Sequence, residues 1–153
     1  MRRMRLNSVL LVLLCLVCGC ENSFNSDVPS YPVNFELDIV GMYPHFIPEN
    51  GFPQTMTFTE KRYVYDAIGF SGLLVWINME GKYCAADLCC PHCLSRSTRV
   101  EAGPYDMYAV CPKCGERYEL TTRWAMPTKI AGNQPLRSYE VTVYPTGKIL
   151  IRN

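Results

Sequence analysis

Two matching cysteine motifs constrain this chain more than any other feature. Residues 90–93 read CPHC, residues 111–114 read CPKC, and 17 residues separate the two motifs. Two residues between cysteines let both thiolates of a tight turn point at one centre, and two such turns complete a tetrahedral sulfur cage. A set of disulfides is the alternative, but a disulfide framework has no need of two matching Cys-Pro-x-Cys units. The sequence therefore predicts a metal site with the ligands Cys90, Cys93, Cys111 and Cys114.

The N-terminal residues have the pattern of an export signal that ends at a cysteine. Three arginines precede a nine-residue apolar run, Val9–Val17, which is about half the length that a membrane-spanning helix needs. Residues 17–20 read VCGC and resemble a bacterial lipobox. We expect residues 1–19 to be a lipoprotein signal peptide, Cys20 to carry the lipid, and residues 20–32 to form a polar tether. The predicted location is the cell envelope, in the periplasm or on the outer surface; an ordinary secretory signal is the alternative.

Without its signal, the chain has the size of one small domain, which we place at residues 33–153. Removing residues 1–19 leaves 134 residues with 12 basic and 14 acidic side chains, so the charge balance gives no electrostatic case for nucleic acid. No Ser-His-acid grouping or paired-carboxylate motif is found. We expect a binding module with an unknown envelope partner, more than a stand-alone enzyme.

Short β-type runs separated by turn residues predict an all-β sandwich or barrel. Lys61–Ile68 is ambiguous between a strand and a short helix, and Gly41–Pro53 is predicted to be a loop in which the lone His45 is solvated and binds no metal. The runs predicted as strands are Val33–Val40, Thr55–Thr59, Leu73–Ile77, Lys82–Asp87, Tyr108–Val110, Arg117–Thr121, Leu136–Val143 and Lys148–Ile151.

From Leu73 to Ile151, about half of the chain, the sequence resembles a Rieske-type ferredoxin domain. Residues 90–92 match the family's Cys-x-His loop and residues 111–115 match its Cys-x-x-His-Gly loop, with Tyr118 at the family's aromatic position and a Pro-containing loop at Ala125–Pro135. The resemblance implies a Rieske-like antiparallel sandwich or barrel with a small rubredoxin-like metal-binding subdomain at about residues 84–120. It also implies an iron–sulfur centre that transfers electrons, and hence an electron carrier with an unknown redox partner.

One departure from the family changes the ligand set. The second loop has Cys114 where the family has histidine, which excludes a Rieske centre with two histidines. Cys90, Cys111 and Cys114 can be completed either by His92, in a [2Fe–2S] arrangement, or by Cys93, in a four-thiolate cage. The knuckle geometry favours Cys93, since residues i and i+3 of such a turn converge on one point.

The identity of the metal stays open at this point. The resemblance favours a [2Fe–2S] cluster or a single iron, and replacing imidazole by thiolate, with Glu116 nearby, would lower its reduction potential. Export in an unfolded state favours zinc, which would make the protein a zinc-stabilised, redox-silent structural or interaction module. Cys84 and Cys89 are expected to be packing residues, with a local disulfide as the alternative.

Overall fold

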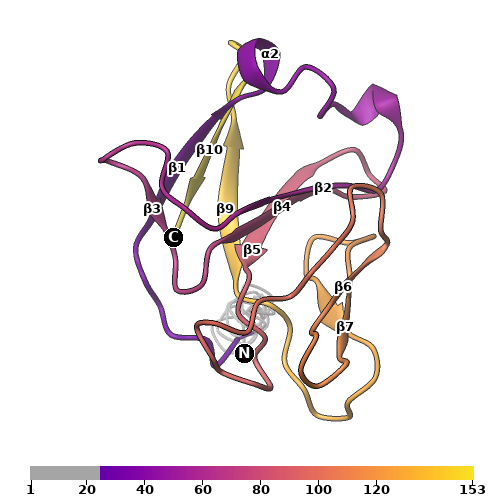
Figure 1. The fold of residues 1–153 in the computed structure, drawn as a ribbon. Coiled ribbons are helices and arrows are strands. Elements are labelled where there is room, and N and C mark those ends of the chain that lie inside the picture. The colour runs from indigo at the N-terminus through magenta and orange to yellow at the C-terminus, as the bar shows by residue number, and fades with distance from the viewer. Residues whose placement is uncertain (1–24) are drawn as a thin grey trace, which may run out of the picture.

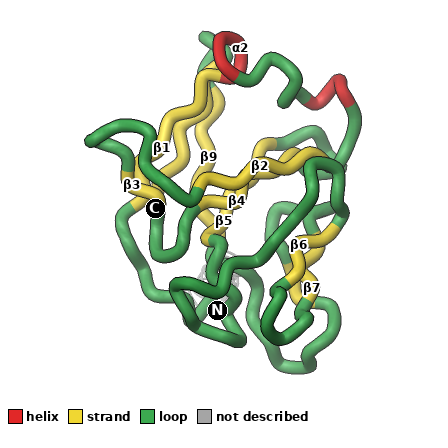
Figure 2. The backbone as a smooth tube through the Cα atoms, in the orientation of Figure 1, coloured by secondary structure: helices red, strands yellow, loops and turns green. Residues whose placement is uncertain are grey.

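The computed structural model describes residues 25–153, which fold around two antiparallel sheets. The larger sheet has the strand order β2-β4-β5-β9-β10-β1-β3 and curls almost into a closed barrel, whereas β6, β7 and β8 form a small sheet beside it (Figures 1 and 2). This arrangement confirms the predicted all-β fold with a small subdomain. The strands are β1 Val33–Asp38, β2 Gln54–Phe58, β3 Ala67–Ile68, β4 Leu73–Ile77, β5 Tyr83–Asp87, β6 Tyr108–Val110, β7 Arg117–Glu119, β8 Met126–Pro127, β9 Ser138–Val143 and β10 Lys148–Arg152.

Strand β4 lies between two hydrophobic clusters, which explains why its sequence LLVWI has no polar residue. Leu73, Val75 and Ile77 face the interior of the large sheet, while Leu74 and Trp76 face the small subdomain. All five side chains are fully buried. A strand covered on both faces reads as a continuous apolar run, because neither face is left to water. The cysteines of the two motifs belong to the same cluster as Leu74 and Trp76, so this part of the chain packs against β4.

The first predicted strand ends two residues early because a short helix follows it. Helix α2 spans Ile39–Met42, and the carboxylate of Asp38 accepts a hydrogen bond from the N–H of Gly41 at 2.8 Å, which caps the helix. A single 3-10 turn, η1, spans Pro48–Asn50. Within residues 25–153, no helix is long or apolar enough to cross a membrane.

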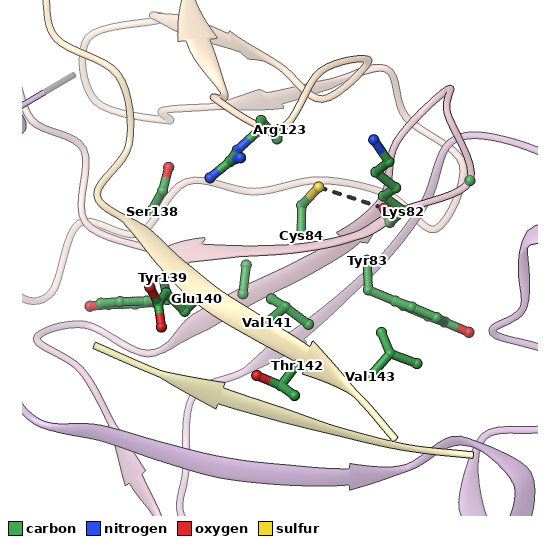
Figure 3. A pocket seen from close by; sticks show the side chains of 12 residues that line it. Lys82, Tyr83, Cys84, Arg123, Ser138, Tyr139, Glu140, Val141, Thr142 and Val143 are labelled. Atoms are coloured by element: carbon green, nitrogen blue, oxygen red, sulfur yellow. Dashed lines mark hydrogen bonds between the residues drawn. The ribbon is translucent and has the colours of Figure 1, made fainter. Parts of the chain in front are cut away.

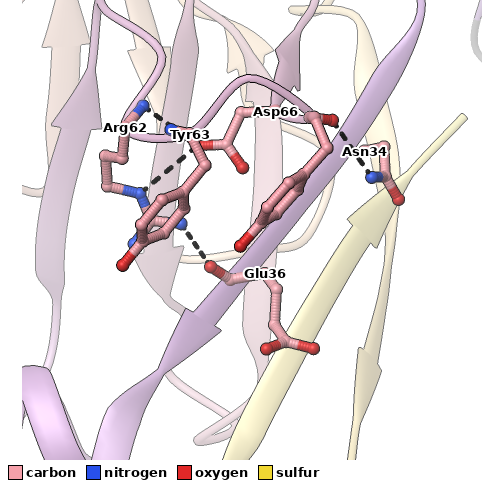
Figure 4. Close-up of polar contacts among 6 residues, drawn as sticks. Asn34, Glu36, Arg62, Tyr63 and Asp66 are labelled. Carbon is pink, nitrogen blue, oxygen red and sulfur yellow. Dashed lines mark hydrogen bonds and ion pairs between the residues drawn. The ribbon is translucent and has the colours of Figure 1, made fainter.

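The ambiguous segment Lys61–Ile68 is mostly a turn and contributes only the two residues of β3 to the sheet. The buried carboxylate of Asp66 accepts hydrogen bonds from the N–H groups of Arg62 and Tyr63, both at 3.0 Å (Figure 4). Arg62 also donates to a backbone carbonyl of β1. These contacts close the turn before β3 and hold it against the edge of the sheet, so neither a long strand nor a helix forms.

Part of the segment predicted to be a tether packs against the domain. Val28 is fully buried, and Arg137 donates to the carbonyls of Val28 and Ser26 at 2.6 and 3.0 Å. The side chains of Asp27 and Gln134 also bond each other at 2.9 Å. Residues 26–28 are therefore held in place beside the loop at residues 130–134. The predicted signal peptide, Cys20 and the start of the tether lie outside the described residues.

A groove opens where β5 and β9 separate. The two strands pair only through Ala85 with Tyr139 and Ala86 with Ser138, and beyond these pairs they line a groove of about 580 Å³ (Figure 3). Cys84 lies in its wall and is 5% exposed. Burial raises the pKa of the Cys84 thiol to about 11, although the charge of Arg123 opposes the shift. Cys84 and the buried Cys89 are both free thiols, as expected for packing residues.

Candidate metal centre

The four cysteines of the two motifs converge on one point. The sulfur atoms of Cys90, Cys93, Cys111 and Cys114 all lie within 4.8 Å of one another. The contacts between the motifs are close: the Sγ atoms of Cys90 and Cys114 are 3.7 Å apart, as are those of Cys93 and Cys111. No second group of three or more potential metal ligands occurs among residues 25–153. The structure thus gathers four thiols that could hold a metal ion.

These sulfur spacings fit a single tetrahedral ion. Thiolates bound to a zinc ion at about 2.3 Å in a tetrahedron lie about 3.8 Å from each other, and an iron ion of similar size gives similar edges. The two contacts of 3.7 Å between the motifs match such an edge. A two-iron cluster distributes its thiolates over two metal positions and needs a more elongated set of sulfur atoms. As placed here, the donor set fits one ion better than two.

The backbone of the two motifs explains why their thiols converge. In the first motif the carbonyl of Cys90 accepts the N–H of Leu94, and in the second the carbonyl of Cys111 accepts the N–H of Gly115, both at 2.9 Å. Leu94 and Gly115 both have a positive φ, 46° and 72°. Each motif is therefore a tight turn that ends in a left-handed residue, with both sulfur atoms on its inner side.

His92 lies outside the thiol group. Its side chain is exposed and lines a shallow pocket together with Asp27 and Gly132, whereas Cys93 is half-buried and belongs to the group. The sequence left two ligand sets open, one completed by His92 and one by Cys93, and the structure brings together the set with Cys93. Metal binding by these four thiols stays a prediction.

Glu116 fixes a third loop beside the second motif. It is fully buried, and its carboxylate accepts hydrogen bonds from the N–H groups of Arg117, Thr128, Lys129 and Ile130 and from the side-chain amide of Asn133. Burial alone would raise the pKa of Glu116, but these hydrogen bonds, that of Asn133 first, outweigh it and lower the pKa to about 2. The carboxylate therefore binds the loop at residues 128–133 and is not one of the clustered ligands.

The same amide orients a tyrosine hydroxyl toward one of the sulfur atoms. Asn133 donates to the hydroxyl oxygen of Tyr118 at 3.1 Å, and that oxygen lies 3.2 Å from the Sγ of Cys90. Burial, followed by the contact with Cys90, raises the pKa of Tyr118, so the hydroxyl keeps its proton. Because its oxygen already accepts from Asn133, its hydrogen is free to point at the sulfur. Cys90 thus receives a hydrogen bond that distinguishes it from the other three thiols.

Asp87 anchors the chain just before the first motif. Its carboxylate is fully buried and accepts hydrogen bonds from the N–H groups of Phe70, Ser71 and Cys89 at 2.7, 3.1 and 2.8 Å, and from the Tyr139 hydroxyl at 2.8 Å. Burial, followed by the charge of Asp87, raises the pKa of Tyr139 and keeps this donor protonated. Four donors compensate the buried carboxylate and fix the entry to the first motif.

Sequence reasoning missed two parts of this site. Neither Asn133 nor Asp87 was identified, and Glu116 was considered only as a charge near the metal. The available signal was the position of Glu116, two residues after Cys114, because a carboxylate that is buried there needs several hydrogen-bond donors. His45 is exposed to solvent, as predicted, and lies outside the thiol group.

No family model matches the sequence, and no curated protein matches it. The solved structures that align with this chain include the following two. One is a ferredoxin of Sphingomonas yanoikuyae B1, with 17% identity and a TM-score of 0.45 over 67% of this chain and 88% of that chain. The other comes from a complex of reduced oxygenase and oxidized ferredoxin in carbazole 1,9a-dioxygenase, with 18% identity and a TM-score of 0.46 over 69% of this chain and 87% of that chain. Similarity at this level places the chain in no family and assigns it no function.

Proposed function

We propose that this chain is a lipid-anchored envelope protein that holds one iron ion in a cage of four thiolates and transfers electrons. The observation that carries the proposal is the convergence of the four sulfur atoms within 4.8 Å, with edges between the motifs of 3.7 Å. Cys90, Cys93, Cys111 and Cys114 would be the ligands. A thiolate-bound iron supplies one-electron chemistry, and the protein determines its potential through hydrogen bonds and solvent exposure.

The uneven burial of the four thiols supports exchange with a partner. Cys90 and Cys111 are fully buried, whereas Cys93 and Cys114 are half-buried and form the outer side of the group. A redox partner would approach from this outer side. The order of motifs in the sequence, which resembles that of Rieske-type ferredoxins, supports iron as the metal.

The second candidate is a structural zinc site, and the sulfur spacing favours it as well. Structural zinc sites are closed four-ligand tetrahedra, and sets of four cysteines are common among them. In that case the metal would stabilise the subdomain and would carry no electrons. The protein would then be an interaction module of the envelope.

Visible absorption combined with metal analysis of the purified full chain separates the two candidates. A single iron bound by four thiolates gives a coloured protein with about one iron per chain, and the colour is lost on reduction. A zinc site gives a colourless protein with about one zinc per chain. Iron content near two per chain, with acid-labile sulfide, would replace the single ion by a [2Fe–2S] cluster. Absence of any stoichiometric metal would refute both candidates.

The lipid anchor is a separate part of the proposal and rests on the lipobox-like residues 17–20. Changing Cys20→Ser should release the protein from the membrane fraction or block its processing, while leaving the thiol group intact. Mature protein that stays in the membrane fraction of this variant would exclude anchoring at Cys20.

A further inference from the structure

A pocket away from the thiol group gathers three cationic side chains. It has a volume of about 380 Å³ and lies between the segment before β1, the turn between β3 and β4, and the loop that follows the first motif. Lys61, Arg96 and Arg99 line it, and no aspartate or glutamate does. The three cations come from two separate segments of the chain, so the folded structure brings them together.

Backbone contacts hold the two guanidinium groups side by side. Arg96 donates through Nε to the carbonyl of Phe70 at 2.7 Å, and Arg99 donates through Nε to the carbonyl of Ser71 at 2.6 Å. These carbonyls belong to consecutive residues. Arg96 is further held over the rings of Tyr31 and Phe70, at 5.0 and 5.2 Å. Both guanidinium groups are therefore positioned in advance, and their terminal nitrogen atoms are left to bind something else.

The charge of this pocket is not balanced within the described chain. Over residues 25–153, Arg96 and Arg99 form no ion pair, and Lys61 has neither an ion pair nor a hydrogen bond. Asp87 contacts the same backbone from the other side through the N–H groups of Phe70 and Ser71, but it contributes one negative charge against three positive ones. Neighbouring like charges repel each other, so the arrangement costs free energy unless an anion enters.

We infer that this pocket binds a phosphate group. Arginine terminal nitrogen atoms and a lysine ammonium are the usual donors to phosphate oxygens, and three cations match a group of charge near −2. The volume exceeds that of phosphate and leaves room for a small alcohol esterified to it. A soluble phosphate monoester carries such a charge, and a phospholipid head group offers the same kind of phosphate oxygen with a charge of −1. The inference stands independently of the metal.

The experiment compares these two sources with the purified, metal-loaded chain. Glycerol phosphate is titrated at constant ionic strength, with calorimetry and the melting temperature as readouts. In parallel, the Cys20→Ser chain, which has no lipid of its own, is sedimented with vesicles of phosphatidylcholine alone or mixed with phosphatidylglycerol. We expect saturable binding of one phosphate group per chain. Binding of glycerol phosphate assigns the soluble source, and binding only to phosphatidylglycerol vesicles assigns the head group.

Three variants test whether the binding belongs to this pocket. Arg99→Gln should weaken it by about tenfold or more, since a charge-assisted hydrogen bond is lost, and Lys61→Gln should weaken it by about fivefold. Lys61 makes no contact that the fold would lose, so this variant stays informative if Arg99→Gln unfolds. Lys129→Gln, an exposed lysine outside the pocket, is the matched control and should change the affinity less than twofold. The inference is wrong if no saturable binding is seen or if Lys129→Gln weakens it as much as Lys61→Gln does.

Discussion

The two cysteine motifs share one backbone geometry but differ in what supports them. The first follows directly after β5, and Asp87 fixes its entry by accepting the N–H of Cys89. The second lies on the hairpin between β6 and β7, and Glu116 fixes it to the separate loop at residues 128–133. The comparison shows that the cysteine spacing specifies the turn, whereas a buried carboxylate next to each turn determines how firmly it is held.

The largest effect should come from breaking the first motif at its second thiol. Cys93→Ala should lose most of the bound metal, because the fourth position of the cage is then open to water and oxidation. His92→Ala, one residue away, should retain metal nearly in full, since His92 is exposed and outside the thiol group. Metal content per chain, measured for both variants in parallel, checks this. The opposite order would show that the ligand is His92.

The support of the second motif should be the next most sensitive point. Glu116→Gln replaces one carboxylate oxygen by an NH₂ group at a site where every neighbour is a hydrogen-bond donor. Some buried N–H groups then lose their acceptor, which should lower the free energy of unfolding by about 3 kcal/mol. Hydrogen exchange should rise at residues 128–133 and stay unchanged around Asp87.

Glu101→Gln is the matched control for this change. Glu101 is an exposed glutamate in the same subdomain, so its replacement should alter the free energy of unfolding by less than about 0.5 kcal/mol. Equal protection of residues 128–133 in Glu116→Gln and the unchanged protein would contradict the role of Glu116, whatever the change in stability.

A smaller effect should follow when one hydrogen bond to the first motif is removed. Tyr118→Phe deletes the donor to the Cys90 sulfur and should cost about 1 kcal/mol of stability. If the metal is iron, the sulfur-to-iron absorption band should also shift, because one thiolate loses a hydrogen bond. Tyr108→Phe, in the neighbouring strand, serves as the control, and an identical spectrum for both variants would count against the contact.

An effect no larger than this should follow when the residue that ends each of the two turns is replaced. Leu94 is about half exposed and has a φ of 46°, a conformation that costs a non-glycine residue about 1 kcal/mol, so Leu94→Gly should raise stability by up to about that amount. Gly115→Ala should lower it by about 1 kcal/mol, although nothing lies within 4 Å of an added Cβ. Urea unfolding of both variants checks this, and a loss of stability in Leu94→Gly would mean that its side chain packs.

Local patterns predicted the parts of the fold that rest on local chemistry. The apolar run of β4 and the spacing within each motif are properties of a few adjacent residues. The first predicted a buried strand and the second predicted a turn that brings two thiols together, and the structure has both. Contacts between residues that are far apart in the sequence leave no such local pattern. Glu116 reaches Asn133 across 17 positions, and Arg137 holds Ser26 across 111, so neither the attachment of the loop at residues 128–133 to Glu116 nor the docking of residues 26–28 was predicted. The turn closed by Asp66 was missed for a different reason: the same residues also fit a strand or a helix pattern.

The carboxylate of Asp87 joins two places that otherwise lie apart. It accepts the N–H of Cys89, which precedes Cys90 of the thiol group, and the N–H groups of Phe70 and Ser71, whose carbonyls hold Arg96 and Arg99. An anion bound near the arginines and a metal bound by the thiols would therefore both affect groups that are hydrogen-bonded to the carboxylate of Asp87. The two sites would then be coupled, and the coupling is reciprocal. If the anion changes the affinity for the metal by some factor, the metal must change the affinity for the anion by the same factor.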